Sequence, residues 1–498
     1  MKVTQFLEHH GLSQNPFSQE DAQTDPLFKQ FCARETFHPA WDKICGQPDD
    51  PATSVVFGEK GSGKTALRLQ MVERIARHNL EQKDNRVYVV EYDDFNPFLD
   101  NFHQRMSVMN RSPHRALSRW RLWDHMDAIL SLAVTQLSDE ILDSSAAESV
   151  GPFDVSAERL AKLNHSQKRD LLLLTAFYDR STGLAPQQRW NQLRSKIRYS
   201  HLRSWWELIL GAVVTPILFG VLAQNGSLNQ FGTWWPWLIL LVAWAPWLWK
   251  QAHLTWKAWW VSRQVRVLHR PLNALRGMLC AFDGRDLISQ PFPSRDRSDD
   301  RYELLGKLQS ILRTLGFTSI TVVVDRVDEP HLVNGNPDRM RELLWPMFDN
   351  KFLKHAGLGF KLLLPAEVSV FLDREDKEFY ERSRLDKQNL IRSLEWSGES
   401  LYDLANDRIR ASSKDRHAAE LLKGWFEESV TENELISTLG RLRVPRHLFK
   451  FLHRLLVDHC HRYTDESPRW NIGRETLQST LAVYLRDLDA YDRGLGTG

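Results

Sequence analysis

Residues 54–69 read SVVFGEKGSGKTALRL and concentrate three glycines, two lysines and a threonine in one short segment. The order fits the pattern Gly-x-x-x-x-Gly-Lys-Thr, between an apolar run and a helical pattern. Glycines let the backbone turn several N–H groups toward one anion, and the following helix adds the positive end of its dipole. The lysine reaches the outer phosphates of a nucleotide, and the threonine hydroxyl binds magnesium. The segment predicts a phosphate-binding loop for Mg·ATP, formed by Gly58, Gly61, Ser62, Gly63, Lys64 and Thr65.

Such a loop needs an acidic partner at the end of a neighbouring strand, to hold the magnesium shell. The segment SITVVVDRVDEP, residues 319–330, has a β-branched run typical of a strand buried on both faces. Asp325 follows that run at once and is the predicted second metal ligand. Asp328 or Glu329 could orient the attacking water, so both are candidate catalytic residues beside Lys64. An alternative acidic pair ends the apolar run 87–94, directly after the loop's helix.

These motifs require a particular set of elements to position them. The loop must join a buried strand to a helix, and the second acid must end another strand of the same sheet. We therefore expect an α/β fold with a central, mainly parallel sheet. The expected domains are a first half of the nucleotide-binding domain over 1–190, a hairpin region over 191–270, a second half over 271–390 and a helical lid over 391–498.

Between the two motifs lies a tryptophan-rich apolar region. The stretches 205–223 and 233–249 are each nearly as long as the roughly 20 apolar residues that cross a bilayer. Basic residues flank them, including Arg198 and Lys250, which favours a hairpin with both flanks on the cytoplasmic side. The expectation is a two-pass transmembrane hairpin in the inner membrane, with the lipid bilayer as a partner. A buried helical pair and a hairpin that dips into the membrane interface are the alternatives.

The C-terminal region reads as a small helical lid. Residues 441–456, RLRVPRHLFKFLHRLL, place a Pro-Arg pair before an apolar helical pattern. The segment resembles the lid helix of regulatory P-loop ATPases, in which a Pro-Arg pair starts the helix and the arginine reaches the γ-phosphate. The resemblance makes Arg446 the candidate for that role, and a solvated basic helix end is the alternative.

Bulk composition excludes some classes of protein. The net charge of the 498 residues is +2, so no global field points to nucleic acid as a partner. The four cysteines are scattered without a Cys-x-x-Cys pair, which disfavours a disulfide framework or a zinc site.

The motifs GEKGSGKT and VVVDRVDEP, separated by a paired apolar insertion, resemble those of the KAP family of P-loop NTPases. The resemblance implies a regulatory ATPase related to AAA and STAND proteins, with paired transmembrane helices between the nucleotide motifs and, in bacteria, a link to phage defence. The family's second motif is typically a strand followed by Asp-Asp-x-Asp. Here Arg326 replaces the middle acid between Asp325 and Asp328, which puts efficient hydrolysis in doubt but leaves binding intact.

The expected function is that of a membrane-anchored P-loop ATPase, a slow or partner-stimulated enzyme that acts as an ATP-dependent conformational switch in anti-phage defence. A homo-oligomer or a separate effector protein is the expected partner, since no nuclease, protease or deaminase motif is visible. Two alternatives stay open: an ATP-binding sensor or scaffold with little hydrolysis, and an ATP-gated effector that permeabilises the membrane.

Overall fold

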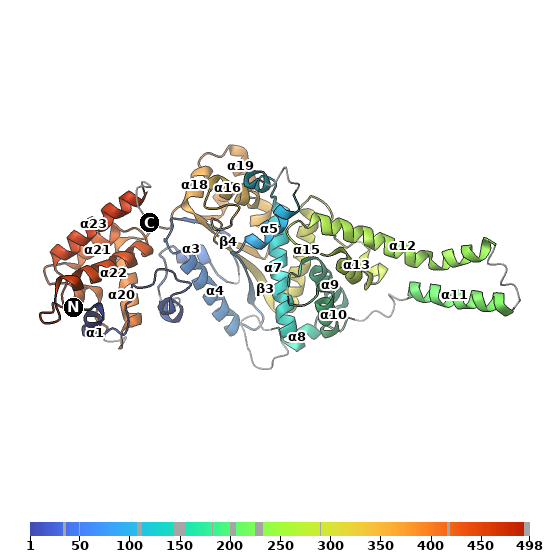
Figure 1. Cartoon of the computed structure of the whole chain (residues 1–498), viewed down its shortest axis with the longest axis horizontal. Helices are drawn as coiled ribbons and strands as arrows, with labels where there is room; N and C mark the ends of the chain where they lie inside the picture. Colours follow the sequence, from blue (N-terminus) through green and yellow to red (C-terminus); the bar gives the residue numbers. More distant parts are fainter. Residues whose placement is uncertain are drawn as a thin grey trace. The chain divides into compact units, whose positions relative to one another are not determined.

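A computed structural model describes the chain over residues 1–32, 36–48, 50–106, 112–143, 155–181, 183–199, 206–224, 233–288, 290–415 and 419–492 (Figure 1). The fold is α/β, with many helices and one five-stranded sheet of order β2-β3-β4-β1-β5. The strands are β1 (Ser54–Gly58), β2 (Arg86–Tyr92), β3 (Phe317–Val324), β4 (Leu358–Pro365) and β5 (Asn389–Ile391).

The strand β1 runs parallel to both of its neighbours. Its register pairs Val56 with Leu363 of β4 and with Ile391 of β5. Every residue of β1 and of β4 is buried, as continuous apolar runs in a parallel sheet should be. Because parallel strands end at the same edge, the loop after Gly58 and the residues after β4 emerge together.

The chain forms two compact units. Unit 1 comprises Met1–His78, Val323–Asp328 and Asp349–Gly498, and unit 2 comprises Asn79–Val322 and Glu329–Phe348. The described helices of unit 1 are α1 (Val3–His9), η1 (Phe28–Cys32), α3 (Trp41–Cys45), most of α4 (Lys64–Glu81), α17 (Asn350–Leu353), α18 (Ala366–Leu372), α19 (Lys377–Ser383), η6 (Leu385–Lys387), α20 (Gly398–Ser412), η7 (Leu422–Trp425), α21 (Glu432–Gly440), α22 (Pro445–Arg462) and α23 (Arg474–Asp492).

Within unit 1, the N-terminal α1 lies beside the C-terminal helices (Figure 1), and α1 shares one apolar core with α20 to α23. Phe6 and Phe17 are buried in this core, and Phe6 meets Trp425 edge-on at a ring-centre distance of 5.9 Å. Phe17 is therefore a packing residue.

Unit 2 is mainly helical. Its described helices are α5 (Asn96–Gln104), α6 (Pro113–Leu117), α7 (Leu122–Asp143), α8 (Ala157–Ala161), α9 (His165–Tyr178), α10 (Pro186–Lys196), α11 (Trp206–Gln224), α12 (Trp235–Gln264), α13 (Leu272–Cys280), α14 (Gly284–Leu287), α15 (Asp299–Thr314), α16 (Pro337–Leu344) and η5 (Trp345–Met347).

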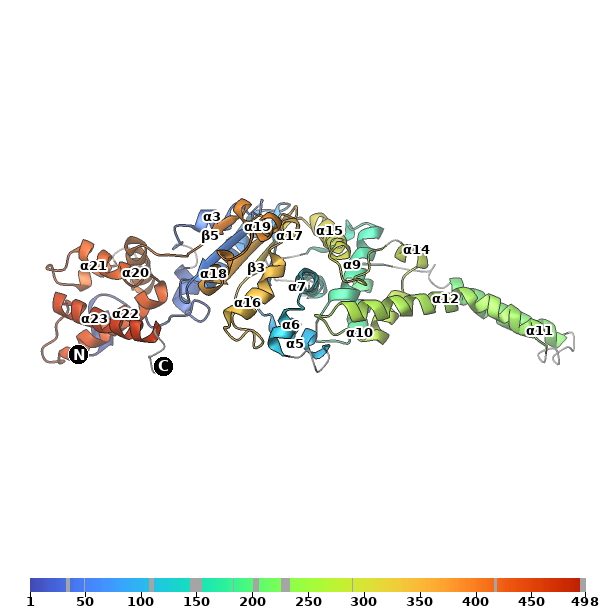
Figure 2. The ribbon, with the colours of Figure 1, turned by 90° about the horizontal axis from the view of Figure 1, so that it is seen from above.

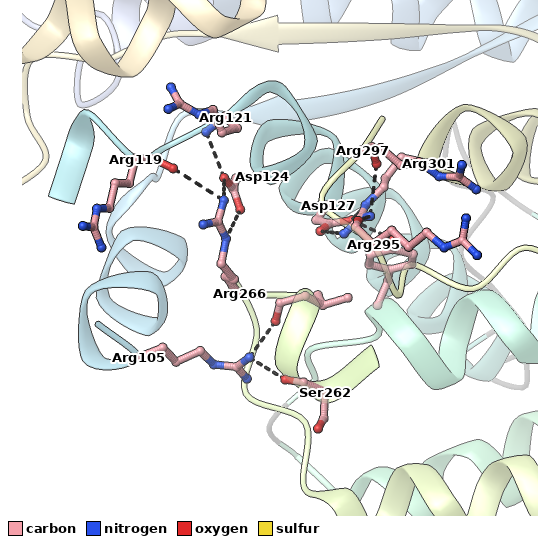
Figure 3. Close-up of polar contacts among 12 residues, drawn as sticks. Arg105, Arg119, Arg121, Asp124, Asp127, Ser262, Arg266, Arg295, Arg297 and Arg301 are labelled. Atoms are coloured by element: carbon pink, nitrogen blue, oxygen red, sulfur yellow. Dashed lines mark hydrogen bonds and ion pairs between the residues drawn. The ribbon is translucent and has the colours of Figure 1, made fainter. Parts of the chain in front are cut away.

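Buried charge pairs hold the helices of unit 2 together. Arg301 of α15 and Asp127 of α7 are both fully buried, and the guanidinium donates to both carboxylate oxygens at 3.1 Å (Figure 3). Removing one member of such a pair would leave the other charge buried without a partner. The pair therefore favours the packing of α15 against α7 in which both charges meet.

The tryptophan-rich region folds as two helices, α11 and α12, which lie side by side (Figures 1 and 2). Among the described residues, no helix combines enough length and enough apolar sequence to cross a bilayer. The predicted transmembrane hairpin is therefore wrong, and so is the predicted two-pass placement in the inner membrane. Trp205 and the connecting residues 225–232 lie outside the described residues.

The helix bounds explain this correction. The 19 residues of α11 include Glu207 and Gln224 at its ends, which leaves fewer than the roughly 20 apolar positions required. The longer α12 has 30 residues, but Lys250 interrupts its apolar part well before such a length is reached. Pro246 and several tryptophans, which carry a polar N–H, further reduce the apolar character of α12.

Candidate functional site

The predicted phosphate-binding loop joins β1 to α4 at the edge where the parallel strands end. Gly61 and Gly63 have φ angles of +93° and +97°, which a residue with a side chain rarely adopts. Space also requires glycine at Gly61, because a Cβ there would lie 2.6 Å from the Cβ of Arg446. The loop conformation therefore depends on these two glycines.

Lys64 and Thr65 open α4, an 18-residue helix whose first turn is aimed at the loop. The Lys64 ammonium donates to the carbonyl oxygens of Gly58 at 2.7 Å and Glu59 at 3.0 Å. Burial lowers the pKa of Lys64, and the carboxylates of Asp325, Asp328 and Glu367 partly oppose that shift. The ammonium of Lys64 is therefore held at the loop backbone, where glycine-loop N–H groups and a helix N-terminus favour an anion.

The acid after β3 reaches the loop from a distant part of the sequence. The Thr65 hydroxyl donates to the Asp325 carboxylate, with 3.3 Å between the oxygens. Asp325 is 2 % exposed, and burial raises its pKa while Arg68 lowers it most. A hydroxyl and a carboxylate side by side are the hard oxygen ligands that magnesium prefers.

The donor set fits magnesium bound together with a nucleotide. Among the described residues, no group of three or more histidine, cysteine, aspartate or glutamate side chains could hold a metal ion. Magnesium in nucleotide sites usually takes one or two protein oxygens and completes its shell with phosphates and water. Thr65 and Asp325 would supply those protein oxygens, and Lys64 would supply the cation toward the phosphates.

Arg68 is a member of the site that sequence reasoning missed. It lies one helical turn after Lys64 on α4, and its Nε is 3.6 Å from Oδ2 of Asp325. Both side chains are 3 % exposed, so the guanidinium compensates the carboxylate where water cannot. In the sequence, Arg68 looks like any charged residue on an amphipathic helix. Its partner Asp325, at the end of β3, becomes visible only in the folded structure.

Trp396 and Arg446 contact the outer side of the loop. The indole N–H of Trp396 donates to the Ser62 carbonyl at 2.9 Å, and the backbone N–H of Arg446 donates to the Gly61 carbonyl at 3.3 Å. Trp396 packs against the C-terminal helical core, and Arg446 is the second residue of α22. The loop backbone is therefore tied directly to the C-terminal helices.

The Arg446 side chain lies beside an N-terminal acid. Its Nε is 4.0 Å from Oε2 of Glu20, and the Lys450 ammonium is 3.4 Å from the same oxygen. The positive charge of Arg446 contributes to lowering the pKa of Lys64. Sequence reasoning named Arg446 but gave no role to Glu20.

Arg326 lies between Asp325 and Asp328 and has an unusual backbone conformation. Its φ angle is +56°, in the left-handed region that residues with side chains seldom occupy. Its backbone N–H supports the Asp325 carboxylate, and its guanidinium donates to the Gln23 side chain. The Arg326 side chain therefore contacts the N-terminal segment, while its backbone N–H donates to the Asp325 carboxylate.

The remaining candidate acids are Asp328, Glu329 and Asp94. Asp328 belongs to unit 1 with the loop, whereas Glu329 begins the second segment of unit 2. The alternative acid Asp94 also belongs to unit 2, where its carboxylate accepts from the Asn96 N–H at 3.1 Å at the start of α5. Asp94 therefore makes a local hydrogen bond in the turn before α5.

No family model, curated protein or solved structure matches the chain. The resemblance to the KAP family depends on the two motifs alone and stays a prediction.

Proposed function

We propose that this chain binds Mg·ATP in unit 1 and works as a slow P-loop ATPase that switches conformation with its nucleotide state. The observation that supports this most directly is the 3.3 Å contact between Thr65 and Asp325, beside a loop with two left-handed glycines. A buried strand end, a glycine loop, a lysine and a magnesium ligand pair together match the chemistry of phosphoryl transfer. Bound magnesium would neutralise the charge of the phosphates.

Each residue has a defined task in this proposal. The loop N–H groups and the N-terminus of α4 bind the phosphates, and Lys64 leaves the carbonyl of Gly58 to contact the outer ones. Asp328 orients the attacking water and accepts its proton. Because Trp396 and Arg446 hold the carbonyls of Ser62 and Gly61, a change in loop conformation is passed to the C-terminal helices.

Arg326 supports a second candidate, an ATP-binding sensor with little hydrolysis. Where the family motif has an acid, this chain has a cation directed to Gln23. One carboxylate fewer near the metal leaves water less well activated, although the loop, Lys64 and Asp325 still favour binding. The pore-forming alternative required helices that cross a bilayer, so it loses its basis.

Nucleotide binding and turnover by purified protein test these two candidates. Titration calorimetry with Mg·ATP should detect binding to the wild type and at least about tenfold weaker binding to Lys64→Ala, since the variant lacks a charged hydrogen bond to phosphate. Lys60→Ala, an exposed lysine of the same loop, is the matched control and should bind normally. Equal affinity for wild type and Lys64→Ala would refute the site. Phosphate release then separates an ATPase from a sensor.

A further inference from the structure

A cavity of about 780 Å³ lies in unit 2 between one face of α12 and the short segment around α14. From α12 it is lined at helical spacing by Trp249, His253 and Lys257, together with their neighbours one turn away. The opposite wall is formed by Asp283, Gly284, Arg285, Leu287 and Ile288. Its volume falls in the range of small-molecule sites. None of the residues proposed for ATP belongs to it.

Positive charge dominates this cavity. Lys250, Lys257 and Arg285 line it against a single carboxylate, Asp283. That carboxylate already accepts from the backbone N–H of Arg285 at 3.2 Å, as the N-cap of α14. Burial lowers the pKa of Lys257, and burial together with the Lys257 charge lowers the pKa of His253. An anion inside the cavity would relieve this excess of cations.

Apolar surface lies directly beside the cations. Trp249 is 76 % exposed and Ile288 is 66 % exposed, one on each side of the cavity, while Leu254 and Leu287 are buried beneath them. Large exposed side chains on both walls of a groove are favourable contacts for an aliphatic chain. The cavity therefore offers a cationic part and an apolar part to the same ligand.

The helix that forms one wall is firmly attached at its end. Arg105 of α5 donates to the carbonyls of Ser262 and Val265, at 2.6 and 2.9 Å, and also to that of Leu268 (Figure 3). Just beyond α12, Arg266 donates to both carboxylate oxygens of the buried Asp124. These contacts fix the base of α12, so the wall is in place before a ligand arrives.

We propose that this cavity binds a single-chain anionic amphiphile, with a phosphate or carboxylate head group and an aliphatic tail. Lys257 and Arg285 contact the head group, and Trp249 and Ile288 contact the tail. A purely polar anion would leave the two exposed apolar side chains in water, and a neutral chain would place no negative charge beside Lys257 and Arg285. The combination selects a ligand that has both parts.

Monomeric dodecyl phosphate, below its micelle concentration, is the direct probe. Calorimetry on the full chain should show it binding at least tenfold more tightly than inorganic phosphate, and at least tenfold more tightly than dodecyl maltoside. Equal binding of phosphate would show that the tail is irrelevant, and equal binding of the maltoside would show that the charge is irrelevant. Either result would overturn the proposal, as would binding to anionic vesicles without any binding of the monomer.

Variants locate the binding. Lys257→Glu and Trp249→Ser should each weaken dodecyl phosphate binding about tenfold or more. Lys162→Glu, an exposed lysine outside the cavity, and Trp256→Ser, an exposed tryptophan of α12 outside the cavity, should leave it unchanged. Unchanged binding in both cavity variants, with their folds verified by circular dichroism, would contradict the assignment. Because Lys64→Ala should not affect this binding, failure here leaves the proposed ATP site untouched.

Discussion

The hydroxyl of Thr65 and the carboxylate of Asp325 lie 3.3 Å apart, although 260 residues separate them in the chain. Thr65 is the second residue of α4, just after the loop that follows β1, and Asp325 directly follows β3. In the sheet, β4 lies between β1 and β3, so the contact between Thr65 and Asp325 spans the end of β4. The site therefore depends on long-range sheet pairing rather than on any local motif alone.

Arg68 should matter to stability even though it need not touch a ligand. Arg68→Met leaves the Asp325 carboxylate buried without its nearest cation, and we expect a loss of about 3 kcal/mol in the free energy of unfolding. Urea denaturation measures this loss. Arg77→Met, which removes an exposed partner of Glu73 on the same helix, should cost at most about 0.5 kcal/mol. Similar losses of unfolding free energy in both variants would show that Arg68 does not stabilise the buried Asp325 carboxylate.

The negative charge of Asp328 raises the pKa of Lys64, so we expect the loss of this carboxylate to affect the site more than the loss of its neighbour Glu329. Asp328→Asn should keep ATP affinity within about twofold and reduce turnover by roughly 10²-fold or more, as expected when a general base is removed. Phosphate release under saturating Mg·ATP measures this. Glu329→Gln is the matched control and should keep most of the turnover. The reverse pattern would transfer the role to Glu329.

Glu20 should compete with the nucleotide for Arg446. Because the pair is half-exposed, its interaction is worth at most about 1 kcal/mol, so Glu20→Gln should tighten ATP binding by up to about fivefold. The gain should disappear in the double variant Glu20→Gln with Arg446→Ala. A gain that persists without Arg446 would mean that Glu20 acts through Lys450 or another group. Titration calorimetry on the four proteins completes the cycle.

His125 should make unit 2 sensitive to acid. Its Nε2–H donates to the Leu343 carbonyl at 2.7 Å, and burial lowers its pKa from 6.5 to about 4. The unfolded chain binds the proton more readily, so stability is full above pH 6.5 and falls as the pH drops toward 4. Between pH 7 and 5 this group should cost roughly 2 kcal/mol.

His125→Gln, which can still donate to Leu343 but cannot titrate, provides the comparison. Urea unfolding of both proteins at pH 7 and pH 5 should show a flatter pH dependence for the variant. Parallel curves would assign the acid sensitivity to other groups.

The parts of the site that could be read from sequence are those with fixed local chemistry. The glycine loop shows itself in consecutive residues, and the β-branched run before Asp325 indicates a buried strand. Arg68, Trp396 and Glu20 carry no such local signal, because each is defined by a partner that is distant in the chain. The role of Arg301 was equally hidden, since a buried arginine and a surface arginine look alike in sequence.

The hairpin prediction failed for a different reason. The tryptophan-rich sequence suggested membrane-spanning arms, but whether a helix can span a bilayer depends on where that helix begins and ends. In α12 the helix runs on past Lys250 to Gln264, so its apolar part is only a fraction of a longer element. Hydropathy of a window could not reveal those bounds.

The apolar core that joins α1 to the C-terminal helices has a consequence for biosynthesis. Phe6, Leu7 and Phe17 leave the ribosome long before Leu401 and Leu481, the residues with which they form one cluster. At typical rates of about 5–20 residues per second, the N-terminal segment waits tens of seconds for its partners. While the rest of the chain is being synthesised, these apolar side chains are exposed to water. We therefore expect chaperones to bind this segment of the nascent chain.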